Sequence, residues 1–152
     1  MDSDVDALKE WITEYIRHKD IFLKSIKEIK QDEKGIGIAV YYKNKKQLII
    51  VEPILSSMEP IIEKIKKSED EYESLILVVF NTKSNLNKII EYWNKLALIS
   101  KLNIYFVNPD SETDKRWIIS PYTHSMVTNP SSLKTGLMSL FSIVDEVKGK
   151  DK

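Results

Sequence analysis

The richest polar segment of the chain spans residues 120–135 and holds one of its two histidines. Its candidate ligand-binding side chains are Tyr122, His124, Ser131, Ser132 and Lys134. The segment lies between the end of a predicted strand and the start of a predicted helix, and the free N–H groups of a helix N-terminus attract anions. We therefore expect an anion or small-ligand contact here, with an ordinary capped loop as the alternative. No spacing pattern supports nucleophilic catalysis by His124 and a neighbouring serine.

A second candidate surface is a basic turn that contains Lys43, Lys45 and Lys46 beside Tyr41 and Tyr42. Lysines next to aromatic rings are suited to contact a nucleic-acid backbone. The alternative is a charged, solvated turn that prevents unwanted strand pairing. The chain has 23 Lys plus Arg and 23 Asp plus Glu, so its formal net charge is zero. This balance argues against a polybasic nucleic-acid binder and leaves nucleic acid as a weak partner.

Several chemistries lack the residues that they need. The chain has no cysteine, which excludes disulfides, thiolate metal sites and thiol nucleophiles. It has no phosphate-binding loop of the Gly-x-x-x-x-Gly-Lys type, and Gly35-Ile36-Gly37 lacks the third glycine of a dinucleotide-binding turn. A zinc site would require both His18 and His124 together with carboxylates. We therefore expect no metal site and no cofactor.

Apolar spacing along the chain predicts the elements that position these groups. Helical spacing predicts N-terminal helices within residues 1–31, followed by a β-hairpin formed by residues 36–42 and 48–51. Strands at 75–80 and 103–107 then alternate with amphipathic helices around 58–65 and 86–97, which is typical of parallel βαβ units. A strand at 116–120, a helix that begins near Asn129-Pro130 and a frayed tail at 148–152 complete the chain.

The fold class that follows is α/β, as a single three-layer α/β/α domain over residues 1–152 with a mixed, mainly parallel sheet of about five strands. The chain shows no internal repeat and no linker that would divide it. We expect the strands that begin near Leu48, Leu75 and Asn103 to be adjacent and parallel, because helical crossovers separate them.

The order helix, hairpin, helix, strand, helix over residues 7–107 resembles the PD-(D/E)XK, or restriction-endonuclease-like, superfamily. Archaeal Holliday-junction resolvases have a similar hairpin. The resemblance implies Mg²⁺ held by two hairpin carboxylates, a lysine that positions water and a glutamate from the first helix. Glu52 matches the second carboxylate and Glu14 the helix glutamate, so these two residues are the candidate catalytic groups of a nuclease.

Two groups of that pattern are missing. The Asp position falls near Ile38, and the lysine position is occupied by Ile54. Because Mg²⁺ needs at least two converging carboxylates, the resemblance implies an inactive nuclease. The alternative for Glu14 and Glu52 is an exposed carboxylate on a helix and at a strand end. A second carboxylate within coordination distance of Glu52 would favour a divergent nuclease that uses Mg²⁺.

The last predicted helix has an apolar arc wider than one buried stripe requires. Its apolar residues are Leu133, Leu137, Met138, Leu140, Phe141, Ile143 and Val144. We expect it to belong to the core and also to contact a protein partner or a second copy in a homodimer.

The acidic N-terminus and the short apolar runs predict a cytoplasmic protein without a membrane contact. A composition rich in Lys, Glu and Ile is typical of thermophiles and also of AT-rich genomes.

The function expected from these residues is a non-catalytic interaction or accessory module, within a nucleic-acid-processing assembly. The first alternative is the divergent metal-dependent nuclease. The second is a Rossmann-like sensor of a small anionic ligand, bound near residues 81–85 or 122–132. A pocket at the carboxyl ends of the parallel strands would favour the sensor.

Overall fold

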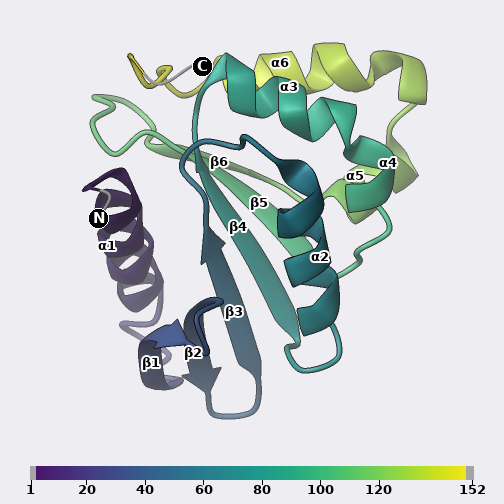
Figure 1. Cartoon of the computed structure of the whole chain (residues 1–152). Helices are drawn as coiled ribbons and strands as arrows, with labels where there is room; N and C mark the ends of the chain where they lie inside the picture. The colour runs from purple at the N-terminus through teal and green to yellow at the C-terminus, as the bar shows by residue number, and fades with distance from the viewer. Residues whose placement is uncertain (1–2, 150–152) are drawn as a thin grey trace.

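The computed structural model describes residues 3–149 and contains one six-stranded mixed sheet (Figure 1). The strands lie in sequence order, and a helix layer covers each face of the sheet. The strands are β1 (Ile26–Glu33), β2 (Gly37–Tyr42), β3 (Lys46–Val51), β4 (Ser74–Phe80), β5 (Leu102–Val107) and β6 (Arg116–Ile119). The α-helices are α1 (Ser3–Lys19), α2 (Met58–Ser68), α3 (Lys83–Glu91), α4 (Trp93–Leu96), α5 (Pro121–Val127) and α6 (Leu133–Phe141), with a 3₁₀ turn at Pro130–Ser132.

The centre of the sheet is parallel, as the two helical crossovers predict. Strand β3 pairs with β4 and β4 pairs with β5, both in parallel. The outer pairs β1–β2, β2–β3 and β5–β6 are antiparallel. The α/β class with a mixed sheet is confirmed, and the strand count is six because residues 26–33 add a strand at one edge. The sheet is not mainly parallel as predicted, because three of its five strand pairs are antiparallel.

Two hydrophobic clusters occupy the two faces of the sheet. On one face, α1 contributes Leu8, Ile12 and Ile16, which pack on Ile49, Val78 and neighbouring strand residues. On the other face, α2, α3, α4 and α6 cover a larger cluster. The central strands are apolar on both sides, so β4 reads as an unbroken apolar run rather than an alternating one.

The prediction of helices throughout residues 1–31 was wrong, because residues 26–33 form the edge strand β1. Ile26 and Ile29 are three residues apart, which is typical of one face of a helix. In β1 the register shifts between Ile26 and Glu28, and a bulge adds one residue to a strand. Because of the bulge, Ile26 and Ile29 are both partly buried although they lie three residues apart on one strand. A bulged strand can therefore show the same spacing of apolar residues as a helix.

Two glycines serve different purposes at the start of β2. Lys34 and Gly35 both have positive φ values, of 57° and 71°, and the Ile36 N–H donates to the Glu33 carbonyl at 3.0 Å. This is the tight turn whose twist matches antiparallel strands. At Gly37 a Cβ atom would collide with the backbone carbonyl of Ile49 on β3. Gly37 thus allows the close approach of β2 to β3.

Three C-terminal predictions differ from the structure. Residues 121–127, expected to be a loop, form the short helix α5 with Pro121 in its first turn. The helix expected over 86–97 is divided at Tyr92 into α3 and α4. Helix α6 ends at Phe141, so Val144 lies beyond it and pairs instead with Asp114 in an isolated bridge. The proposed tail 148–152 lies outside the described residues from position 150 onward.

The wide apolar arc of the last helix is largely used inside the molecule. Leu137 and Phe141 are buried, and Leu133, Met138 and Leu140 pack against the same cluster. Ile143, which follows the helix, is 51% exposed. Within residues 3–149, no helix is long and apolar enough to cross a bilayer.

Candidate binding cleft at the carboxyl ends of the central strands

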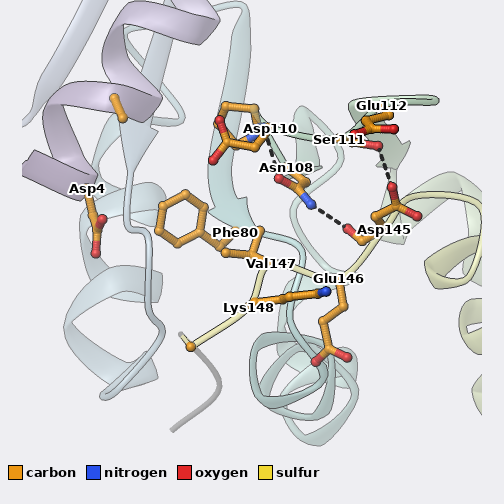
Figure 2. A pocket seen from close by; sticks show the side chains of 13 residues that line it. Asp4, Phe80, Asn108, Asp110, Ser111, Glu112, Asp145, Glu146, Val147 and Lys148 are labelled. Atoms are coloured by element: carbon orange, nitrogen blue, oxygen red, sulfur yellow. Dashed lines mark hydrogen bonds between the residues drawn. The ribbon is translucent and has the colours of Figure 1, made fainter.

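A cleft of about 990 Å³ opens where β4 and β5 end, beside the first turn of α1 (Figure 2). The carboxyl ends of parallel strands are the usual place for ligands in α/β sheets. We call this hollow the carboxyl-edge cleft. Its lining residues are Asp4, Ala7, Phe80, Asn108, Pro109, Asp110, Ser111, Glu112, Asp145, Glu146, Val147, Lys148 and Gly149.

Asn81, directly after β4, joins β4 to β6 and to the segment after α6. Its side-chain amide donates to the carbonyl oxygens of Val144 at 2.9 Å and, at longer range, of Phe141 and Asp145. Its amide oxygen accepts the indole N–H of Trp117 at 2.7 Å. These bonds take up carbonyl groups at the end of α6 and fix the segment that forms one wall of the cleft.

Asn85 makes a similar connection on the other side of β4. Its side chain accepts from the Leu55 N–H at 2.8 Å and donates to the carbonyls of Pro53 and Phe80 at 2.8 and 2.9 Å. The hydroxyl of Thr82 caps α3 by accepting from the Asn85 N–H. Because all these polar groups are bonded to backbone, they build the sheet edge and are not offered to a ligand.

The loop after β5 is held in the same way. Asn108 donates its amide N–H to the Asp145 carbonyl at 2.9 Å, and its oxygen accepts from the Asp110 N–H. The Ser111 hydroxyl donates to the Asp145 carboxylate at 3.2 Å and accepts from the Thr113 N–H. The serine hydroxyl therefore shapes the loop, and no imidazole lines the cleft beside it.

The cleft combines an apolar floor with an acidic rim. Figure 2 shows the Phe80 ring between Asp4 on one side and Asn108 and Asp145 on the other. The lining contains one lysine, Lys148, and more acids than bases. The acids are Asp4, Asp110, Glu112, Asp145 and Glu146. Glu146 accepts the Lys83 N–H at the start of α3, so part of its charge stabilises that helix end. Asp110 and Glu112, which are exposed on the rim, favour a positively charged ligand, opposite in sign to the anion predicted for the sensor.

The structure does not bring the predicted ligand residues of segment 120–135 to this cleft. Tyr122 and His124 lie on α5, Ser131 and Ser132 in the 3₁₀ turn and Lys134 on α6. The His124 ring contacts Trp93 edge-on at 5.6 Å, and its Nε2 is buried without a hydrogen-bond partner. Ser131 bonds through its N–H and its hydroxyl to the Asn129 side chain, which is a local cap.

A smaller groove of about 380 Å³ lies between these C-terminal helices and α3–α4. Its lining comes from Ile90, Glu91, Trp93, Asn94, Ala97, Ser125, Thr128, Pro130 and Leu133. The five predicted ligand residues are outside that lining, so the anion contact stays a prediction.

The three lysines of the basic turn have different surroundings. The Lys46 amine lies 3.1 Å from Glu71, and this hydrogen bond raises the pKa of Lys46. Lys43 and Lys45 are exposed at the turn between β2 and β3. The Lys45 amine lies over the Tyr42 ring at 5.0 Å. Lys43 and Lys45 are therefore the two members of the predicted set that are available for contact.

Glu14 and Glu52 lie on opposite faces of the sheet. Glu14 is exposed on α1, whereas the Glu52 carboxylate lies 3.9 Å from Lys64 of α2. Burial raises the pKa of Glu52, and Lys64 opposes that shift. The structure therefore does not bring together the two carboxylates of the nuclease hypothesis. Within residues 3–149, no group of three or more Asp, Glu or His side chains is arranged to hold a metal ion.

An aromatic cluster between α1 and β6 was not predicted from the sequence. Trp11 and Tyr15 stack at 5.1 Å, and the Arg116 guanidinium lies over the Tyr15 ring at 4.9 Å. Tyr15 also contacts Tyr105 edge-on, and burial raises the pKa of Tyr105 to about 12. The cluster fixes α1 against the antiparallel edge of the sheet, and so places the first turn of α1 at the cleft.

Comparison with protein-family models, with curated proteins and with solved structures gave no significant match. The residues that line the cleft were also missed by the sequence reasoning. A polar loop directly after a buried parallel strand, as in residues 108–115, is the signal that indicates them.

Proposed function

We propose that this domain is a non-catalytic binding module that receives a positively charged, partly apolar protein segment in the carboxyl-edge cleft. The observation that carries the proposal is the composition of the cleft, in which an apolar floor around Phe80 lies under a rim of carboxylates. A lysine or arginine side chain combines an apolar stem with a charged head and so matches both parts.

The hydrogen bonds of the cleft support binding rather than catalysis. Asn108 and Ser111 are bonded to Asp145 in the segment after α6, and Glu146 is bonded to the start of α3. Asp110 and Glu112 are exposed on the rim. Walls held in this way stay in place when a ligand enters, so less conformational freedom is lost on binding.

A labelled peptide in which lysines flank a phenylalanine and a leucine tests the proposal by fluorescence anisotropy. We expect saturable binding that weakens at least about tenfold, or about 1.4 kcal/mol, in the double variant Asp110→Lys, Glu112→Lys. The matched control reverses two exposed acids outside the cleft, in Glu63→Lys, Asp70→Lys, and should bind as the wild type does.

A peptide with glutamates in place of the lysines should not bind, because the rim repels it. Equal binding of both peptides, or equal weakening in both double variants, would contradict the proposal. The nucleic-acid-processing context expected from the family resemblance stays a prediction, for which labelled single-stranded and duplex DNA are the probes.

A further inference from the structure

The connection between α1 and β1 presents apolar side chains to solvent in a fixed shape. Ile21, Phe22 and Leu23, which we call the tip, are 51%, 94% and 75% exposed. Contiguous exposed apolar side chains on an otherwise polar surface mark a contact site. The sequence predicts helices within residues 1–31, and the structure instead places Phe22 at the most exposed point of this connection.

The tip is held by one carboxylate. Asp20 accepts the Ser25 N–H at 2.9 Å, the Ser25 hydroxyl at 2.6 Å and the Ile26 N–H at 2.9 Å. The Lys24 N–H closes the turn on the Asp20 carbonyl at 2.7 Å, with Lys24 at a φ of +49°. Four bonds to one residue keep the loop in a single conformation, and this reduces the entropy lost when the tip docks.

Lysines surround the tip. Lys19 ends α1 and Lys24 follows the tip directly. Lys43 donates its N–H to the Ser25 carbonyl at 2.9 Å, and Lys45 lies in the same turn. Asp20 is acidic and lies next to the tip, but its carboxylate accepts hydrogen bonds from Ser25 and Ile26. The tip is therefore apolar at its centre and positive at its edge.

The carboxyl-edge cleft is the complement of the tip, because it is apolar at its floor and negative at its rim. The two lie at opposite ends of α1, since Asp4 and Ala7 line the cleft whereas the tip follows Lys19. A helix of 17 residues is about 25 Å long. Figure 1 shows α1 as one continuous helix that separates its two ends. One molecule therefore cannot place its own tip in its own cleft.

We propose that the occupant of the carboxyl-edge cleft is the tip of a second copy of this chain, in a head-to-tail contact. This inference rests on the proposed binding function and names the partner. Because the two surfaces are different and lie at opposite ends of α1, the contact is heterologous and leaves one free tip and one free cleft in each dimer. Further copies then add to both ends.

Sedimentation velocity on two complementary variants tests the contact. Phe22→Glu, Leu23→Glu blocks the tip, and Asp110→Lys, Glu112→Lys blocks the cleft. The wild type should form dimers, trimers and larger species as its concentration rises from micromolar to millimolar. Each blocked variant alone should remain monomeric. An equimolar mixture of the two should stop at dimers, because the tip-blocked chain still has a cleft and the cleft-blocked chain still has a tip.

Control variants separate the contact from general effects of charge. Val127→Glu changes an apolar residue of α5 that is 79% exposed, and Glu63→Lys, Asp70→Lys changes acids outside the cleft. Both should assemble as the wild type does. Because the substituted side chains of the tip are exposed, thermal unfolding of the tip-blocked variant should match the wild type.

Raising the salt from about 0.1 M to about 1 M shortens the screening length roughly threefold and should shift the wild type towards monomer.

Three results would overturn the inference. The first is a wild type that is monomeric at every concentration, and the second is a mixture of blocked variants that stays monomeric. The third is wild-type binding to vesicles of anionic lipid, lost in the tip-blocked variant without any self-association, which would assign the tip to a membrane surface. Where one of these results is found and the tip-blocked monomer binds the lysine peptide, the binding function survives and only the identity of the partner fails. If it does not, the binding function fails as well.

Discussion

The indole N–H of Trp117 donates a hydrogen bond of 2.7 Å to the side-chain oxygen of Asn81, deep in the molecule. Asn81 follows β4 and Trp117 lies on β6, and between them β5 carries Phe106, whose ring stacks on Trp117 at 4.2 Å. The same asparagine binds carbonyls after α6. One amide thus joins the centre of the sheet, its antiparallel edge and the C-terminal segment that forms the cleft wall.

We expect Asn81→Ala to lower the free energy of unfolding by roughly 2–4 kcal/mol, because it removes the partner of the buried Trp117 N–H and of the Val144 carbonyl. Urea denaturation followed by tryptophan fluorescence measures the change. The control is Asn87→Ala at an exposed position of α3, with an expected change within about 0.5 kcal/mol. Equal stability of the two variants would show that Asn81 does not hold these segments.

Gly37→Ala should be destabilising by about 1–3 kcal/mol, because the new Cβ collides with the Ile49 carbonyl and separates β2 from β3. Gly136→Ala is the matched control. A Cβ there meets no atom within 4 Å, and helix α6 should gain roughly 0.5–1 kcal/mol from the better helix former. Thermal unfolding of both variants should show shifts of opposite sign, and a shift of the same sign in both would contradict the close approach.

Phe141→Ala should cost about 3–5 kcal/mol, because Phe141 is 5% exposed within the larger hydrophobic cluster. Ile143→Ala, two residues later, changes a side chain that is 51% exposed and should change stability much less. Calorimetry on both variants measures the difference. An unaffected Phe141→Ala protein would remove the last helix from the core.

The Asp20 bonds make the stability of the tip dependent on pH. The Ser25 hydroxyl, and then the Ile26 N–H, lower the pKa of Asp20 below its ordinary value of 3.8. A carboxyl group with a lowered folded-state pKa stabilises the protein fully above its unfolded-state pKa, and this contribution is lost as the pH falls through the folded-state value. Asp20→Ala should therefore be less stable than the wild type near about pH 7, and this difference should close near about pH 2.

Denaturation of both proteins over that pH range measures the difference. Asp70→Ala, in the exposed connection between α2 and β4, is the control for a general loss of one acid. A difference between wild type and Asp20→Ala that is constant from about pH 7 to about pH 2 would show that the carboxylate charge does not hold the tip.

We expect no cleavage of DNA or RNA with Mg²⁺ or Mn²⁺, because Glu14 and Glu52 lie on opposite faces of the sheet. A gel assay with labelled duplex, single-stranded and junction substrates measures this activity. Cleavage by the wild type that disappears in Glu52→Gln would reverse the assignment. Glu63→Gln, on the exposed face of α2, is the control for contaminating nucleases.

The central architecture could be predicted from the sequence, because local patterns specify it. Apolar runs at 48–51, 75–80 and 103–107 separated by amphipathic helices predict adjacent parallel strands, and β3, β4 and β5 have this arrangement. The absence of cysteine and of glycine-rich phosphate loops follows directly from the residues. The capped turn at Asn129 was also predictable, since Asn129 accepts the Ser131 N–H as its type and position indicate.

The tertiary structure decided the features that depend on distant partners. Residues 26–33 have a helical spacing of isoleucines, but pairing with β2 and the bulge in its register make them a strand. Helix α6 ends at Phe141, and Asn81, 60 residues earlier, binds the carbonyls of Phe141 and Val144 at this end. The cleft arises where the loop after β5, the segment after α6 and the first turn of α1 meet. The spacing of residues along the sequence does not show which segments pack together here, since the contacts join residues that are far apart in the chain.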